Sequence, residues 1–337
     1  MADSKDYITV KDIAKKLGLH HSTVSRALRD YPDISEKTKE KVNELARKMN
    51  YTPNIVAQSL KTNKSNLIGI IVPEILHNFF SSAISGIENY VYNHGYVPIV
   101  LQSNESTERE NLNIEAMITN RIAGIIVSVS QETVSGDNLQ KFIDKSIPVV
   151  FFDRAIKGLK AGYVLSDDEN GALQGVQYLI KQGYRKIAHF SGPENLTISR
   201  NRMQGYLKAL KKNKLPIDSN LIFHGTLHEN YGYQAMEKLI SQGNLPDAIF
   251  AVNDPVAMGA YKKIKEAGLK MPDDIAVLGF SNNEVGSYLD PPLSTIDQFP
   301  KKMGELAARI LLGYMENGET EKKVEIQSTK LINRGTT

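Results

Sequence analysis

Polar and charged side chains follow directly on several short apolar segments of this 337-residue chain. They stand in Phe152-Asp153-Arg154, Val252-Asn253-Asp254 and Phe280-Ser281-Asn282-Asn283. After a fourth such segment, Ser191-Gly192-Pro193 is followed by Thr197-Ile198-Ser199-Arg200-Asn201-Arg202, which leads into a helix. Carboxylates, amides, hydroxyls and guanidiniums that converge in one cleft suit a polyhydroxylated or anionic small molecule. We favour Arg200 and Asn253 as ligand groups. Asp254 fits a helix cap before Pro255 as well as it fits a ligand group, and Arg202 equally fits a surface salt bridge.

Catalytic chemistry has little support in the sequence. The chain has no cysteine, which excludes disulfides and thiolate metal sites. Its seven histidines show no metal-ligand pairing on one helix face. There is no nucleophile elbow and no glycine-rich phosphate loop after the first apolar run. We therefore expect a protein that is not an enzyme and that uses no metal and no cofactor, with His189 as a hydrogen-bonded core residue.

Residues 9–60 have the pattern of a helix-turn-helix followed by a hinge. Thr9 can cap a helix over residues 10–17 with one apolar face, and Gly18 can end it at a sharp turn. A second short helix is expected over residues 21–28, and a third begins near Ser35. Two short helices joined by a glycine turn, with a third closing the core, predict a DNA reader.

The distribution of charge favours the same interpretation. The whole chain carries a net charge of only +3, but residues 1–64 hold thirteen Lys and Arg against eight Asp and Glu. The basic surplus thus lies where a phosphate-facing domain needs it, although charge alone also fits a solvated helical face. No apolar run approaches the ~20 residues of a membrane span, and the N-terminus lacks the apolar core of a secretion signal. We expect a cytoplasmic protein that acts at the nucleoid.

The segment from Tyr51 to Leu60 has the pattern of a short helix. Thr52 and Pro53 can start a helix, which then offers fewer than three turns and is too short to be stable alone. A marginal helix beside a DNA-binding domain predicts a segment that orders on DNA. An ordinary short linker helix remains the alternative.

From Leu67 onward, short β-branched runs alternate with amphipathic stretches. Expected strands are 67–72, 97–101, 123–129, 148–152, 187–190, 248–252 and 275–280, and expected helices include 80–94, 170–181, 202–211, 231–241, 255–267 and 302–314. This alternation predicts parallel sheets covered on both faces, and its length favours two similar lobes. The cleft between them, at the carboxyl ends of the strands, is the expected ligand site.

Specific motifs resemble those of the LacI/GalR family of bacterial transcription regulators. They are Val10-Lys11-Asp12-Ile13-Ala14, Thr23-Val24-Ser25-Arg26-Ala27-Leu28, Tyr51-Thr52-Pro53-Asn54, Ala257-Met258-Gly259-Ala260, Pro292-Leu293-Ser294-Thr295-Ile296 and Asn333-Arg334-Gly335-Thr336. The resemblance covers essentially the whole chain. It implies an N-terminal all-α helix-turn-helix domain (7–50), a hinge helix and linker (51–66) and an α/β two-lobed periplasmic-binding-protein-like core of Rossmann-like lobes. The first lobe would comprise 67–165 with 297–325, and the second 166–296 with 326–337.

The resemblance also implies roles at DNA. Three residues of the recognition helix, His21, Ser22 and Arg26, would lie at base edges, whereas backbone phosphates would be contacted by Thr9, Thr23, Ser25 and Thr38. In the hinge, Leu60 would wedge into a base step, with Ala57 facing the partner helix and Asn54 near the backbone. His20 departs from the small hydroxyl residue that usually caps the recognition helix. A palindromic operator of double-stranded DNA would match a homodimer.

The expected effector pocket departs further from the family. Ser281 stands where many sugar-binding members have an aspartate, Leu227 replaces a stacking aromatic, and Leu196 replaces the arginine of the purine-binding branch. Phe79 and Phe80 would supply a stacking wall, and Asp153, Arg200, Asn253 and Ser281 the polar contacts. A carbohydrate or sugar derivative is the class that these residues favour. The chain ends after the last family motif, without a tetramerising leucine heptad, and so predicts a dimer.

Two other classes of function compete with a ligand-responsive regulator. A sugar-binding receptor of the periplasmic-binding-protein type shares the two-lobed core but has no use for residues 9–60. An α/β enzyme would need a catalytic constellation, which the sequence does not show.

Overall fold

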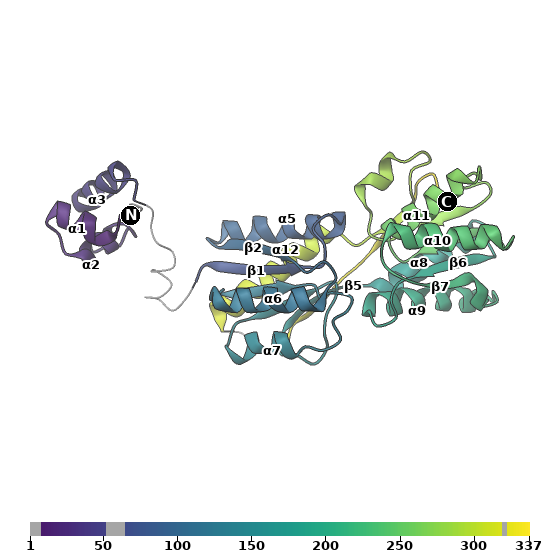
Figure 1. The fold of residues 1–337 in the computed structure, drawn as a ribbon, viewed down its shortest axis with the longest axis horizontal. Helices are drawn as coiled ribbons and strands as arrows, with labels where there is room; N and C mark the ends of the chain where they lie inside the picture. Colours follow the sequence, from purple (N-terminus) through teal and green to yellow (C-terminus); the bar gives the residue numbers. More distant parts are fainter. Residues whose placement is uncertain (1–7, 52–64, 319–321) are drawn as a thin grey trace, which may run out of the picture. The chain divides into compact units, whose positions relative to one another are not determined.

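The computed structural model describes residues 8–51, 65–318 and 322–337. The chain divides into two compact units, Met1–Ser65 and Asn66–Thr337 (Figure 1). Each unit has its own hydrophobic core.

The first unit is a bundle of three helices, α1 (Val10–Leu17), α2 (His21–Ala27) and α3 (Glu36–Lys48). Its core consists of the side chains of Ile13, Ala14, Val24, Ala27, Val42 and Ala46. The Asp12 carboxylate accepts the Thr9 backbone N–H at 2.8 Å and so satisfies a donor that the start of α1 leaves free. Gly18 ends α1 with φ +64°, a conformation that glycine adopts without strain. The predicted helix-turn-helix is confirmed.

The first lobe of the second unit is a six-stranded parallel sheet in the order β11-β5-β4-β3-β1-β2. Its strands are β1 (Leu67–Val72), β2 (Val97–Gln102), β3 (Gly124–Val127), β4 (Val149–Phe152), β5 (Gly162–Ser166) and β11 (Val324–Gln327). One face is covered by α5 (Asn78–Asn93) and α12 (Pro300–Asn317), and the other by α6 (Thr107–Thr119) and α7 (Asp137–Asp144). Both faces are therefore buried, as a parallel sheet requires.

The second lobe repeats this plan with a four-stranded parallel sheet in the order β7-β6-β8-β9. Its strands are β6 (Ile187–Ser191), β7 (Ile222–His224), β8 (Ala248–Ala251) and β9 (Ala276–Leu278). The sheet is covered on one face by α8 (Asp168–Lys181) and α9 (Thr197–Lys212) and on the other by α10 (Glu229–Ser241) and α11 (Asp254–Glu266). Two short 3₁₀ helices (Ser219–Leu221 and Glu284–Tyr288) and an antiparallel pair, β10 (Thr295–Asp297) with β12 (Lys330–Ile332), complete the lobe.

The chain passes between the lobes three times: from β5 to α8, from β10 to α12, and from β11 to β12. The predicted fold class, an all-α domain plus a two-lobed α/β core, is confirmed. All seven expected strands are present with small shifts at their ends, whereas β5, β7, β10, β11 and β12 were not predicted. Within the described ranges, no helix is long and apolar enough to cross a membrane.

Candidate functional site

A cavity of about 30 Å³ lies between the two lobes. We call it the effector cavity. The first lobe contributes His77, Phe79, Phe80, Asp153 and Arg154, and the second contributes Ile198, Arg202, Leu227, Asn253 and Ser281. Gln298, on the passage from β10 to α12, completes the lining. Asp153, Arg154, Asn253 and Ser281 come from loops that follow parallel strands, which is where ligands bind in open α/β sheets, whereas Arg202 projects from α9.

Arg202 is the most firmly held side chain of this cavity. It projects from α9, is 2% exposed, and donates from Nε and Nη2 to Asp168 Oδ1 at 2.9 and 2.7 Å. Its Nη1 donates to the Val252 carbonyl at 2.7 Å, and its guanidinium lies 3.9 Å from the ring centre of Phe280. Burial is the main cause that raises the pKa of Asp168 to about 6. The guanidinium is thus fixed at the cavity wall by four contacts.

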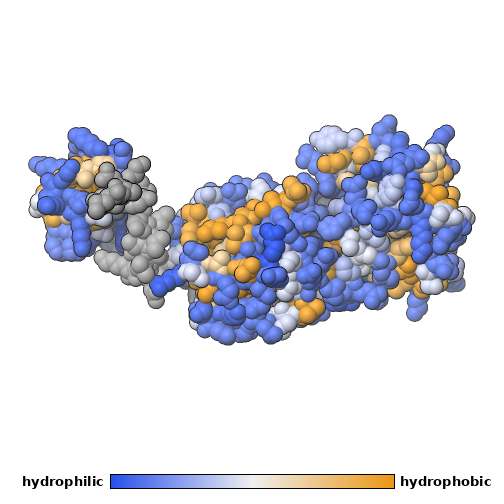
Figure 2. Space-filling model, viewed as in Figure 1, coloured by the Kyte–Doolittle hydropathy of each residue, from blue (hydrophilic) through white to orange (hydrophobic). Residues whose placement is uncertain are grey.

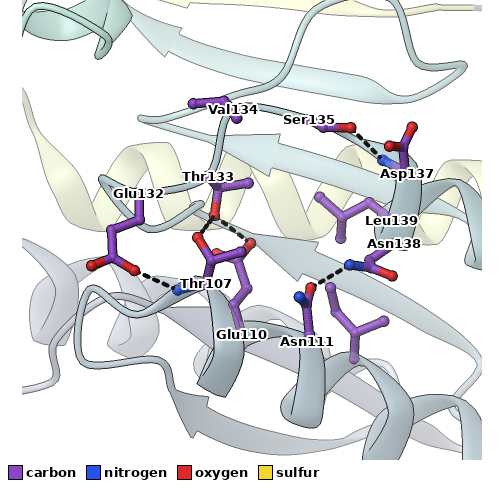
Figure 3. A pocket seen from close by; sticks show the side chains of 11 residues that line it. Thr107, Glu110, Asn111, Glu132, Thr133, Val134, Ser135, Asp137, Asn138 and Leu139 are labelled. Carbon is purple, nitrogen blue, oxygen red and sulfur yellow. Dashed lines mark hydrogen bonds between the residues drawn. The ribbon is translucent and has the colours of Figure 1, made fainter.

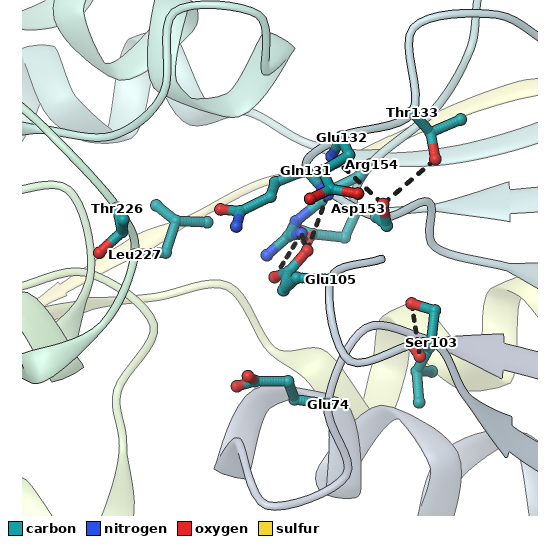
Figure 4. Close-up of polar contacts among 12 residues, drawn as sticks. Glu74, Ser103, Glu105, Gln131, Glu132, Thr133, Asp153, Arg154, Thr226 and Leu227 are labelled. Carbon is teal, nitrogen blue, oxygen red and sulfur yellow. Dashed lines mark hydrogen bonds and ion pairs between the residues drawn. The ribbon is translucent and has the colours of Figure 1, made fainter. Parts of the chain in front are cut away.

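A second buried ion pair lies on the first-lobe side. Arg154 Nη1 donates to both carboxylate oxygens of Glu105 at 2.9 Å, and Arg154 Nε has no hydrogen-bond partner in the described part of the chain. Asp153 precedes it in the left-handed region with φ +58° and accepts Gln298 Nε2 at 3.5 Å. Burial raises the pKa of Asp153. Figure 4 shows Arg154 between Glu105 and Gln131, with Leu227 of the second lobe opposite.

The second-lobe loops divide their roles differently from the sequence-based hypothesis. Asn253 caps α11, because its Oδ1 accepts the Val256 N–H at 2.9 Å, while its Nδ2 donates to the Leu227 carbonyl at 2.9 Å. Asp254 is fully buried and accepts the Thr295 hydroxyl and the Asn283 N–H, each at 2.6 Å. Asp254 therefore binds the loops together and lies outside the lining of the cavity.

Several buried polar atoms at the cavity have no partner among the described residues. They include Ser281 Oγ and His77 Nδ1. Burial is the main cause that lowers the pKa of His77 to about 4, so the ring is neutral at physiological pH. Unpartnered buried groups are costly, and a bound ligand with hydroxyl groups would supply their missing hydrogen bonds.

Another cavity, of about 120 Å³, lies within the first lobe beside Glu110 (Figure 3). The Glu110 carboxylate accepts the Ser130 N–H at 2.7 Å and the Thr133 hydroxyl at 2.8 Å. None of the described residues that line this cavity has a buried polar atom without a partner. Its polar groups therefore satisfy one another and connect loops within the lobe.

The first unit presents a polar face on α2. His21 and Arg26 are exposed, and Ser22, Thr23 and Ser25 are half-buried, whereas Val24 and Ala27 pack into the core. His20 caps α2 in place of a hydroxyl residue: its Nδ1 accepts the Ser22 N–H at 3.4 Å and contacts the Ser22 hydroxyl at 2.7 Å.

Arg26 is held within this unit by an ion pair with Asp33 and lies 5.4 Å from the ring centre of Tyr31. The Thr38 hydroxyl is 2.8 Å from that of Ser35, at the start of α3, and Thr9 lies exposed at the start of α1. Asn54, Ala57 and Leu60 lie outside the described residues.

Comparison with known proteins agrees with both halves of this architecture. Residues 9–54 match the model of bacterial regulatory proteins of the lacI family, and residues 176–337 match a periplasmic binding protein-like domain. The transcriptional repressor PurR of Vibrio atlanticus is 32% identical over 330 residues, covering 97% of this chain and 98% of PurR. A Bacillus subtilis protein named "Probable HTH-type transcriptional repressor ExuR" is 35% identical and covers 97% of each chain. This chain belongs to the lacI family.

A solved structure of another lacI-family member supports the assignment. The lac repressor dimer bound to operator and an anti-inducer is 26% identical, covers 98% of this chain and 99% of its own, and superimposes with a TM-score of 0.87. The lacI-family chain described here is a ligand-responsive, DNA-binding transcription regulator of the repressor type.

Five of the six effector residues expected from the sequence line the effector cavity of this lacI-family chain: Phe79, Phe80, Asp153, Asn253 and Ser281. Arg200 does not. Its guanidinium is exposed and donates to the carbonyls of Glu194 and Asn195 at 2.8 and 2.7 Å, at the start of its own helix. For Arg202 the sequence left two alternatives open, a ligand group and a surface salt bridge, and the structure buries it in the lining of the cavity. His77 and Gln298 were not singled out from the sequence, and Arg154 was named among the polar groups that follow the strands but not chosen as an effector residue.

Proposed function

We propose that this repressor binds a palindromic operator as a homodimer and that a carbohydrate in the effector cavity sets its operator affinity. The observation that carries the carbohydrate class is the lining itself. Guanidinium, carboxylate, amide, imidazole and hydroxyl groups converge there, next to the rings of Phe79 and Phe80. Hydroxyl groups both donate and accept, so a sugar can use all of these partners, while aromatic rings pack against its apolar faces.

The balance of buried charge favours a neutral sugar. Two guanidiniums, of Arg154 and Arg202, are matched by three carboxylates, of Glu105, Asp153 and Asp168. An anionic ligand would add a fourth negative charge to a buried cluster in which carboxylates already outnumber cations.

At the operator, His21, Ser22 and Arg26 contact base edges, and Thr9, Thr23, Ser25 and Thr38 contact phosphates. The shared polar face of α2 and the basic surplus of the first 64 residues support these roles. Asn54, Ala57 and Leu60 act in the hinge. To contact a base, Arg26 must give up its ion pair with Asp33 and its contact with the Tyr31 ring. Part of the free energy of its contact with DNA therefore offsets the loss of those two contacts.

Exposed apolar side chains support the homodimer. Leu76 and Tyr288 are 99% and 77% exposed. Figure 2 shows apolar residues gathered over the part of the first lobe where α5 and β2 lie. Exposed apolar patches of this kind mark protein interfaces.

Gln298 connects ligand binding with the movement of the two lobes. Gln298 lines the effector cavity and stands on a passage between lobes, where Phe299 has φ +54° and donates its N–H to Asp297 Oδ1 at 2.7 Å. A ligand that contacts Gln298 together with both lobes biases their relative rotation, and the hinge transmits the bias to the helix-turn-helix. The protein so described acts in the cytoplasm and catalyses no reaction.

Selection from random duplex DNA with the full-length chain tests the operator hypothesis. We expect the recovered sequences to be inverted repeats whose half-sites are spaced by about one helical turn. Recovery of single, unpaired half-sites would contradict the homodimer. A thermal-shift screen of neutral sugars and sugar phosphates tests the ligand class, because ligand at about 100 times its Kd adds about 2.7 kcal/mol of stability. A response confined to sugar phosphates would contradict the neutral class.

A further inference from the structure

A larger cavity adjoins the effector cavity. Its volume is about 320 Å³, against about 30 Å³ for the effector cavity, and the two share Asp153 and Ile198 in their linings. We call the larger cavity the annexe. The ion pair between Arg202 and Asp168 stands at the partition, because Arg202 lines the effector cavity and Asp168 lines the annexe.

The two cavities differ in size. The effector cavity, at about 30 Å³, is smaller than a sugar unit, so a sugar held by its lining extends into the annexe, and pockets for small molecules start near about 300 Å³. The annexe reaches that range on its own.

The annexe is amphipathic. Tyr163, Leu165 and Ile326, from the neighbouring strands β5 and β11, form an apolar wall on the first lobe. Opposite them, Thr197 and Asn201 of α9 and the acidic start of α8 contribute polar groups.

One buried group of the annexe requires a partner. Ser166 ends β5, is 6% exposed and lines the annexe, and its Oγ is buried without a hydrogen-bond partner in the described part of the chain. An unmade hydrogen bond of this kind destabilises the folded state unless a ligand or water completes it.

The charge of the annexe restricts its occupant. Asp167, Asp168 and Glu169 line it, and Lys157 is its one lining cation among the described residues. Carboxylates accept hydrogen bonds from hydroxyl groups strongly and repel anions.

We infer that the annexe binds a second, neutral sugar unit of the effector, so that the effector is a disaccharide, a longer oligosaccharide or a glycoside of similar size. This inference rests on the proposed function, since it extends the ligand from the effector cavity. The apolar wall packs against the C–H face of the second unit, and Ser166 and the carboxylates bind its hydroxyls. Ser166 and Ile326 lie on two of the three passages between the lobes or directly beside them, so the second unit also contributes to the lobe rotation.

Calorimetric titration of the full-length chain tests the inference. The probes are D-glucose, D-galactose and D-xylose, and the disaccharides maltose, cellobiose, lactose and melibiose. We expect one disaccharide or more to bind, and to bind at least about tenfold more tightly than its constituent monosaccharides, since one hydrogen bond to a charged group corresponds to about that factor.

Two substitutions fill the annexe from different walls. Ser166→Phe fills it from the buried strand end, and Ile326→Trp fills it from a residue that is 56% exposed and whose replacement leaves the core intact. Val324→Trp is the matched control, because Val324 lies two residues before Ile326 on β11, is 48% exposed and does not line the annexe. Both filling substitutions should weaken disaccharide binding at least about tenfold, and the control should change it less than about twofold.

Equal affinity for a disaccharide and its monosaccharides, or unchanged disaccharide binding in Ile326→Trp, would overturn the inference. Arg202→Met separates this failure from a failure of the proposed function. If a sugar binds and Arg202→Met leaves its affinity unchanged, the effector cavity is not its site, and the proposed site and the annexe fall together. Binding that is lost in Arg202→Met but unaffected by either filling substitution would overturn the annexe alone. A chain that binds none of the seven sugars would contradict both.

Discussion

Replacement of Arg202 separates two arginines that lie two residues apart in the sequence. Arg202→Met removes two hydrogen bonds to Asp168, one to the Val252 carbonyl, and the contact with the Phe280 ring. Arg200→Met removes only exposed contacts with the start of its own helix. The two variants are therefore matched in chemistry and opposed in burial.

The magnitude follows from the charge that is left behind. Removing one partner of a buried ion pair costs about 3–5 kcal/mol, because the remaining charge is unpaired. Burial already raises the pKa of Asp168 to about 6, and the loss of the guanidinium raises it further. Protonation of Asp168 near neutral pH then limits the loss, and we expect Arg202→Met to lower the free energy of unfolding by about 3 kcal/mol. Arg200→Met should change it by less than about 0.5 kcal/mol.

Urea unfolding of the second unit, Asn66–Thr337, which we call the core unit, measures the free energy of unfolding of both variants at several pH values. A carboxyl group whose pKa is higher in the folded state than in the unfolded chain lowers the free energy of unfolding as pH rises. The loss takes place between the pKa of the unfolded chain and the pKa of the folded state. In Arg202→Met this interval extends above pH 6, so stability should fall further between pH 6 and 8 than in the wild-type chain. Adding Asp168→Asn should remove that slope. Equal stability of the Arg200 and Arg202 variants, or a slope that persists without Asp168, would refute the reasoning.

Three further predictions concern packing, pH and DNA. Gly259→Ala should destabilise the core unit by about 1–3 kcal/mol, because a Cβ there would lie 1.9 Å from the Glu229 carbonyl oxygen between α10 and α11. His77→Gln should lessen the loss of stability on acidification from pH 6.5 to 4. The neutral buried ring of His77, with its pKa lowered to about 4, contributes up to about 3 kcal/mol to that loss. Arg26→Ala should weaken operator binding by about 1–3 kcal/mol and relax specificity at the base it contacts.

Each of these predictions has its own control. Gly243→Ala meets no atom within 4 Å but has φ +64°, so it should cost only about 1 kcal/mol, and an equal cost at Gly259 would argue against the close helix contact. For His77, the free energies of unfolding of the wild-type chain and of His77→Gln are compared at each pH. The comparison is needed because Asp168 and Asp254, with pKa values raised to about 6, stabilise the folded state on acidification in both chains. Asp33→Asn releases Arg26 and should tighten operator binding; weaker binding would show that the ion pair positions Arg26 for DNA.

The sequence predicted the alternation of strands and helices because buried parallel strands are continuous apolar runs. It missed β11, where Val324 and Ile326 are exposed and Glu325 and Gln327 alternate with them, so the edge strand lacks such a run. The helix-turn-helix was predictable because its cap, glycine turn and apolar spacing are all local.

The choice between Arg200 and Arg202 was beyond the sequence. Two residues on a helix point about 200° apart, and only the packing of α9 against α8 decides which of them is buried. Likewise, Asn253 and Asp254 both fit a helix cap by type. In the structure the Asp254 carboxylate is occupied by the Thr295 hydroxyl, and Asn253 accepts the Val256 N–H and caps α11.

Fluorescence anisotropy of a labelled operator duplex, titrated with the full-length chain at fixed salt, tests the central claim most directly. The titration is done without and with a saturating concentration of the sugar that stabilises the chain. We predict that the sugar changes the operator Kd of the wild-type chain by about 5–150-fold, the range that an allosteric coupling of about 1–3 kcal/mol gives. We predict no change of the operator Kd in Arg202→Met. An operator Kd that saturating sugar leaves unchanged in the wild-type chain would contradict the claim that ligand in the cavity controls DNA binding.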